Sequence, residues 1–222
     1  MKIFEDGIYY INNSEQYIEV LDGKNILIID FLVNNETKRY IKISCPANIN
    51  YNLGIVGKNN FDIKIDILSG ESCVNIKSLS FSKNKEEING NLSINLLNKE
   101  IYSNTEIIGL CDDGGVINIS GNVFIDFDSY KSEGYLNQKT VFLTDNGTSN
   151  ITPTLNVSCN DVKASHGASI SKLNEFDKFY ICSKGIDLKS YYNLIISSYI
   201  NNFNENLNNE NISNKFFDYI NN

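Results

Sequence analysis

Residues 161–186 read DVKASHGASISKLNEFDKFYICSKGI, and this stretch decides the fold of the chain. It contains the single histidine, His166. Before Lys172 the sequence alternates between apolar and polar residues, which is typical of strands. After Lys172, Phe176, Phe179 and Tyr180 stand at positions i, i+3 and i+4, which indicates a helix. The stretch therefore marks the change from a strand region to a helical region.

The strand region extends upstream to about Tyr17. Apolar residues share one face at every second position in many short segments separated by turns rich in Asn, Gly, Asp and Ser, which predicts strands. Three such segments are Ile63, Ile65 and Ile67; Leu92, Ile94 and Leu96; and Val123, Ile125 and Phe127. The two prolines, Pro46 and Pro153, are expected at strand boundaries. A sandwich, a barrel and a parallel β-helix all fit this pattern.

The helical region continues as an apolar stripe that ends near Tyr199. Gly185 is expected to separate its first two helices. A third short helix is predicted over 211–219, after an Asn-rich linker over 201–209. The stripe either packs against the last strands or forms a docking surface. These patterns divide the chain into a strand domain, 1–171, and a helical subdomain, 172–222. The stripe is formed by Leu188, Tyr191, Tyr192, Ile195, Ile196 and Tyr199.

Composition excludes several classes of function. The formal net charge is −8 and there is one arginine, Arg39, so nothing indicates binding to nucleic acid. The five cysteines form no CxxC pair, so neither a disulfide framework nor a zinc site is predicted. We expect a cytoplasmic protein without a membrane segment, because the chain has no signal sequence and no apolar run of spanning length. The high asparagine content is interpreted as genome bias.

The stretch 161–186 resembles the signature of the SufB/SufD family of iron–sulfur cluster assembly proteins, closer to SufD-like members. The resemblance includes Gly134-Tyr135, the strand 140–145, the segment 153–157 and the segment 191–195, and covers about the last 110 residues. It implies a mainly β protein, a right-handed parallel β-helix with a small C-terminal helical subdomain. It also implies a short form that lacks the family's N-terminal helical region.

The resemblance further implies a subunit that is not an enzyme. The chain has no Gly-x-x-x-x-Gly-Lys-Ser/Thr loop for nucleotide phosphates, and in this family an ABC-type ATPase, SufC, binds the C-terminal helices. The second partner is expected to be a SufB-like scaffold subunit or another copy of the chain. The residues predicted to contact SufC are Phe179, Tyr180, Gly185, Ile186, Tyr191, Leu194 and Ile195.

His166 is the one candidate ligand for iron, because a neutral imidazole can bind this metal. Clusters are held mainly by thiolates, yet Ala164 stands where SufD-like sequences have cysteine. Gly167 replaces the acidic residue of SufB-like sequences, and the strand 138–144 lacks their cysteine. We therefore expect no stably bound cofactor, and at most a transient iron–sulfur cluster at a subunit interface that a partner completes.

Two other functions stay open. A β-helix carbohydrate lyase or hydrolase would need clustered carboxylates, and the carboxylates here are scattered along the chain. An interaction protein that has kept the fold and lost the cluster site fits the missing ligands equally well.

Overall fold

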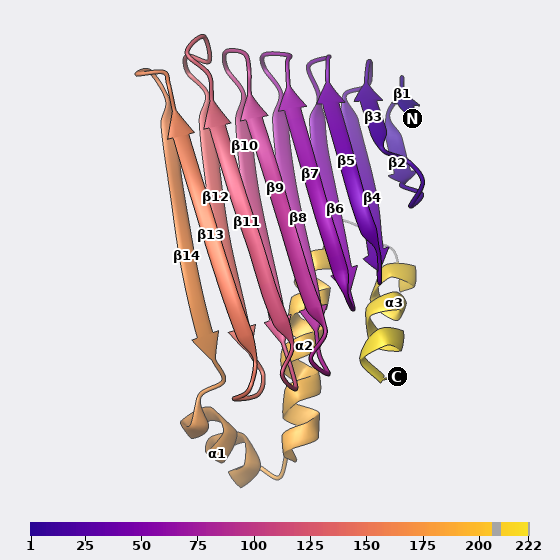
Figure 1. The fold of residues 1–222 in the computed structure, drawn as a ribbon, viewed down its shortest axis with the longest axis vertical. Helices are drawn as coiled ribbons and strands as arrows, with labels where there is room; N and C mark the ends of the chain where they lie inside the picture. The colour runs from indigo at the N-terminus through magenta and orange to yellow at the C-terminus, as the bar shows by residue number, and fades with distance from the viewer. Residues whose placement is uncertain (206–209, 222) are drawn as a thin grey trace.

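The computed structural model describes residues 1–205 and 210–221 and consists of a two-sided solenoid with three helices (Figure 1). The solenoid has two parallel sheets of seven strands each, and the chain alternates between them. We name them sheet A, in the order β1-β3-β5-β7-β9-β11-β13, and sheet B, in the order β14-β12-β10-β8-β6-β4-β2. The predicted parallel β-helix is confirmed.

The strands lengthen along the chain, from two and four residues in the first coil to ten residues in each of the last coils. Sheet A consists of β1 (Lys2–Ile3), β3 (Tyr17–Val20), β5 (Glu36–Ile43), β7 (Asn59–Ile67), β9 (Glu87–Leu96), β11 (Val116–Ile125) and β13 (Thr148–Val157). Sheet B consists of β2 (Gly7–Tyr10), β4 (Asn25–Val33), β6 (Asn48–Val56), β8 (Cys73–Ser82), β10 (Tyr102–Cys111), β12 (Glu133–Phe142) and β14 (Lys163–Lys172). The helices are α1 (Glu175–Ser183), α2 (Leu188–Asn204) and α3 (Glu210–Asn221).

The main core lies between the two sheets and follows directly from the alternation in sequence. Ile65 pairs with Ile94, and Ile94 pairs with Val123, so these three side chains stack in one row across neighbouring coils. Each of them is at most 1% exposed. Because successive residues of a strand point to opposite faces, every second residue enters this core.

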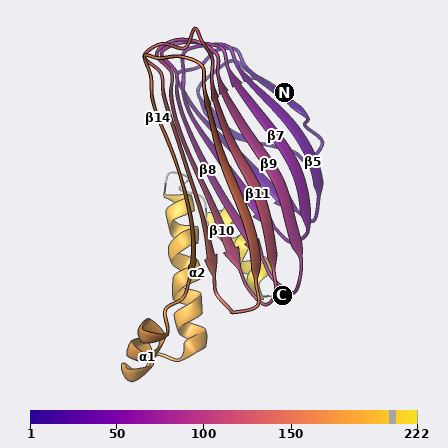
Figure 2. The same cartoon turned by 60° about the vertical axis from the view of Figure 1, so that its left-hand side comes forward.

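A second core lies on the outer face of sheet B, under α2 and α3. Leu79, Phe81 and Leu110 of the sheet pack in one cluster with Ile196, Ile200, Phe203 and Phe216 of the helices. Figure 2 shows α2 along this sheet and α1 beyond the ends of the strands. The C-terminal halves of β6, β8 and β10 are therefore buried on both faces, as expected of parallel strands covered by helices.

The helices reach the first coils as well as the last. The ring of Phe216 in α3 contacts the ring of Phe31 in β4, with centroids 4.9 Å apart, and the Asn52 side chain in β6 donates to the Phe203 carbonyl at 3.0 Å. Gly54 makes room for this contact, since a Cβ there would lie 2.4 Å from Phe31 and 3.1 Å from Phe216. The helices therefore pack against several coils of sheet B, and not against the last coil alone.

The asparagines have a structural role that composition did not predict. On the outer face of sheet A, Asn60, Asn89, Asn118 and Asn150 occupy one row of the register. The Asn89 amide donates to Asn60 at 3.2 Å, and the Asn118 amide donates to Asn89 at 3.0 Å. An amide side chain both donates and accepts, so it can continue such a ladder from coil to coil.

Several boundaries predicted from sequence were wrong. β11 ends at Ile125, so Phe127 lies in the following turn and is 67% exposed. Pro153 lies inside β13 rather than at its boundary, because β13 is an edge strand with no neighbour that requires the missing N–H. Helix α2 continues through 201–204, where a linker was expected, since Ile200 and Phe203 extend its buried face. The remainder of that predicted linker, 206–209, lies outside the described residues.

Candidate functional site

The last coil of the solenoid, β13 and β14, is an open end. Each strand pairs on one side only, β13 with β11 and β14 with β12. Each is ten residues long, so both present a long row of unpaired backbone N–H and C=O groups. Such edges are templates for pairing with another chain.

Most of the side chains that face inward on this coil are apolar, and they are incompletely covered. The register places Ile151, Leu155 and Val157 of β13 above the core residues of β11, and Ala164 and Ile170 of β14 above the inward-facing Gly134 and Thr140 of β12. Val157 is 44% exposed and Ile170 is 51% exposed. One coil earlier, Val123 and Leu136 are at most 2% exposed. The interior of the solenoid is therefore uncovered at this end.

His166 lies in β14, at the open end. It pairs with Leu136, a core residue, so its imidazole is on the inward side of β14, and it is exposed. Within the described residues it makes no hydrogen bond and no ion pair. The imidazole nitrogens are thus available to a ligand or a partner chain.

The chain provides few other ligands for a metal at this end. Ala164 and Gly167 flank His166, and the buried Gln138 lies in the adjacent strand. Cys159 is half-buried in the turn between β13 and β14, and Cys111 is buried within sheet B. Among the residues that the structure describes, no three His, Cys, Asp or Glu side chains form a group that could hold a metal ion.

Two lysines at the ends of β14 are paired with carboxylates. Lys163 binds Glu133 at 2.7 Å and Lys172 binds Asp145 at 2.6 Å. The hydrogen bond from Lys163 lowers the pKa of Glu133, which also accepts from the Tyr135 hydroxyl at 2.9 Å. The positive charges that border the open end are therefore partly neutralised, which leaves its apolar centre as its main feature.

The second candidate surface is α1. It has no buried residue, and its aromatic side chains Phe176, Phe179 and Tyr180 are 82%, 76% and 59% exposed. Gly185, at a φ of +83°, follows its C-cap, a left-handed conformation that favours glycine. Large exposed apolar patches usually mark interaction sites.

The residues predicted to contact SufC divide into two groups. Phe179, Tyr180 and Leu194 are exposed, whereas Ile186 and Ile195 are half-buried. Tyr191 is 7% exposed and belongs to the cluster under α2, so it holds α2 on sheet B and is not available to a partner in this structure. The single apolar stripe expected from sequence is therefore two surfaces, an exposed one on α1 and a buried one on α2.

Comparison with known proteins identifies the family. The family described as "SUF system FeS cluster assembly, SufBD core domain" matches residues 35–199. The chain belongs to the SufBD family. An 80-residue stretch is 40% identical to "Protein ABCI7, chloroplastic" of Arabidopsis thaliana, and it covers 36% of this chain and 17% of the plant protein. The chain thus matches only a small part of that relative.

SufBD membership supports involvement in iron–sulfur cluster assembly. The match includes most of the solenoid, the open end, all of α1 and most of α2. No helix in the described part of this SufBD chain is long and apolar enough to span a membrane.

Proposed function

We propose that this SufBD chain is a SufD-like, non-catalytic subunit of an iron–sulfur cluster assembly complex of the SufBCD type. It pairs through its open end with a second SufBD chain and binds an ABC-type ATPase of the SufC class through its C-terminal helices. The open end carries the proposal, because two ten-residue strand edges lie beside an uncovered apolar interior.

Pairing at this end would satisfy two physical requirements at once. The unpaired backbone groups of β14, and those of β13 except at Pro153, which has no N–H, would gain hydrogen bonds, and Ile170 and Val157 would lose contact with water. Burial of an apolar side chain of this size contributes roughly 1.5–3 kcal/mol. The partner is either a SufB-like chain or a second copy, since both would present an equivalent end.

At the joint, His166 is the one residue of this chain that we assign to a transient cluster. Cluster iron is bound chiefly by cysteine thiolates, and Ala164 and Gly167 supply no ligand. The partner chain must therefore provide the other ligands. If the partner is a second copy, this ligand set is not completed and the chain acts as an interaction subunit without a cluster.

The experiment that tests the pairing replaces Ile170 with lysine, which places a charge at the inward side of β14. Ser169→Lys is the matched control, because Ser169 is exposed on the outward side of the same strand. We expect Ile170→Lys to weaken association with the second SufBD chain at least tenfold, and Ser169→Lys to have little effect, in sedimentation equilibrium. Equal association of both variants with the partner excludes the open end as the interface.

The ATPase assignment needs point variants rather than a deletion. Removal of residues 187–222 would uncover the apolar outer face of sheet B, so loss of binding could come from misfolding. Phe179→Ser changes a side chain that is 76% exposed, and Asp177→Ser on the same helix is its control. We expect only Phe179→Ser to reduce copurification with a SufC-type ATPase, and undiminished copurification of this variant argues against docking on α1.

A test of His166 separates cluster assembly from a purely interacting role. His166→Ala should lower the amount of cluster reconstituted on the complex while association, measured by sedimentation, stays unchanged. Full cluster formation with His166→Ala indicates that the chain serves the complex without touching the cluster.

A further inference from the structure

The two ends of the solenoid are built differently. The first coil has strands of two and four residues, β1 and β2, whereas the last has two strands of ten. Because all strands are parallel, β14 of one copy could pair with β2 of the next, and β13 with β1. That contact is heterologous and does not close, so it would generate a filament. A feature of the first coil that opposes this contact would keep the assembly finite.

The segment between β2 and β3, residues 11–16, lies across the start of the solenoid. β2 stops at the partner of Ile29, and β3 begins at the partner of Tyr40. Between them, the Ile11 N–H donates to the Ile29 carbonyl and the Tyr40 N–H donates to the Gln16 carbonyl, at 2.9 and 2.8 Å. The chain therefore leaves one sheet, crosses the core and joins the other sheet. We call this crossing segment, Ile11–Gln16, the plug.

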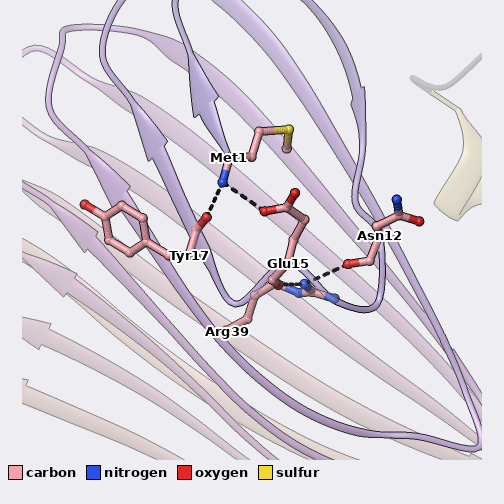
Figure 3. A network of polar contacts seen from close by, with 5 residues as sticks. All are labelled: Met1, Asn12, Glu15, Tyr17 and Arg39. Carbon is pink, nitrogen blue, oxygen red and sulfur yellow. Dashed lines mark hydrogen bonds and ion pairs between the residues drawn. The ribbon is translucent and has the colours of Figure 1, made fainter.

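The plug is anchored by the single arginine of the chain. Figure 3 shows the Arg39 guanidinium between the carbonyls of Asn12 and Glu15. The distance to the Asn12 carbonyl is 3.3 Å. On its other side, Arg39 pairs with Asp30 through two nitrogen–oxygen contacts of 2.6 and 3.0 Å, and the Tyr51 hydroxyl donates to Asp30 at 3.0 Å.

These anchoring side chains are covered although no strand of the first coil reaches them. Asp30 follows the last β4 residue paired with β2, and Arg39 precedes the first β5 residue paired with β3. Both side chains are nevertheless 0% exposed. The plug is the segment of the first coil at this level. Its polar residues Asn12, Asn13, Ser14 and Gln16 are exposed, and Glu15 is half-buried. Polar and charged residues at a sheet edge oppose the addition of further strands.

We propose that the plug, held by Arg39, blocks the N-terminal end of the solenoid against the open end of another SufBD chain, and so limits end-to-end assembly to a single pair. This inference rests on the proposed pairing through β13 and β14. It assigns Arg39 and Asp30 a role in the stoichiometry of the complex.

The test releases the plug and measures the size of the assembly. In the triple variant Asp30→Leu, Arg39→Met, Tyr51→Phe, apolar side chains replace the whole buried cluster, which keeps the core filled and leaves no unpaired charge. The Glu15 carbonyl loses the Arg39 donor, and the Asn12 carbonyl keeps only the Glu15 N–H as a donor. In sedimentation velocity we expect a concentration-dependent series of species larger than the pair formed by the parent chain. Adding Ile170→Lys should remove this series, because it blocks the other end.

A second variant keeps the test independent of the core. Glu15→Pro removes the N–H that donates to the Asn12 carbonyl within the plug, at 3.0 Å, together with the carboxylate that binds the Met1 amino group at 2.9 Å. It leaves Arg39 in place. Hydrogen exchange at Ile11 and Tyr40 should become faster in both variants, with larger species appearing in proportion.

The outcomes separate this inference from the proposed function. If hydrogen exchange shows that the plug is released and the assembly keeps the stoichiometry of the parent chain, the proposed role of the plug is wrong. If Ile170→Lys leaves the parent pair intact, the pairing through the open end is wrong, whatever the plug variants show. Larger species that persist after Ile170→Lys is added also contradict the inference, because they do not use the open end.

Discussion

Phe216→Ala tests whether α3 is held on sheet B by one side chain. The Phe216 ring is 0% exposed and lies edge-on to Phe31 and Phe203, with centroid distances of 4.9 and 5.7 Å. An aromatic side chain buries at least about 150 Å², which at 25 cal/mol per Å² is about 4 kcal/mol. This agrees with the roughly 3–5 kcal/mol lost in core Phe→Ala substitutions.

The expected response is local, because a 12-residue helix is marginal without tertiary contacts. We expect α3 to detach before the solenoid unfolds, so that hydrogen exchange of the α3 amides accelerates by about two to three orders of magnitude, at about 1.4 kcal/mol per tenfold. The strand amides of β8 and β10 should keep their protection. Asn214→Ala, at an exposed position of the same helix, is the control and should change neither region.

The reasoning is refuted if α3 in the Phe216→Ala variant exchanges at the parent rate. It is also refuted if strands and helix lose protection together, since that result places α3 within the same cooperative unit as the solenoid.

Two further predictions concern titration. The hydrogen bond to Asp66, 2.7 Å long, raises the pKa of Tyr40 to about 12, and the unfolded value is about 10; stability that Tyr40 contributes is therefore complete below pH 10 and is lost as the pH rises towards 12. Between pH 10 and pH 12, the unfolding free energy measured by urea denaturation should decrease by about 1–2 kcal/mol less in Tyr40→Phe than in the parent chain, a moderate difference because the ring is partly exposed. Parallel curves of unfolding free energy against pH would exclude the hydrogen bond as the cause. Burial raises the pKa of the Cys111 thiol to about 12, so at pH 8 a thiol reagent should modify Cys111 only after unfolding and the exposed Cys182 at once. Loss of the fast phase in Cys182→Ser checks this order, and rapid labelling of native Cys111 contradicts it.

The alternation of apolar residues was sufficient to predict strands, but it could not predict how sheets stack. That choice came from the resemblance around His166. Pro153 was placed at a boundary because a proline interrupts a paired ladder, and only the position of β13 at the sheet edge explains why it is tolerated. Tyr191 shared one helical stripe with Phe179 in sequence, yet the turn at Gly185 and the contact with sheet B separate exposed from buried positions.

The plug was missed although the sequence contains a signal for it. Arg39 stands two residues before Ile41, on the inward side of its strand, and Asp30 stands between Ile28 and Leu32 on the inward side of its own. Two opposite charges at apolar positions of consecutive strands, one in each sheet, indicate a buried pair. Which backbone carbonyls would receive the remaining donors depends on the crossing of residues 11–16, and this is a tertiary feature.

The helical layer on sheet B also determines when the protein can finish folding during its synthesis. Asn52 donates a hydrogen bond to the carbonyl of Phe203, which is 151 residues later in the chain. Phe31 and Phe216, whose rings are in contact, are even farther apart in sequence. The ribosome releases the chain from the N-terminus onward, and domains fold as units. The early coils must therefore keep their outer apolar face exposed until the last helices have been translated. A premature stop before α3 would leave this face uncovered, and such a truncated product should be a substrate for chaperones or proteases.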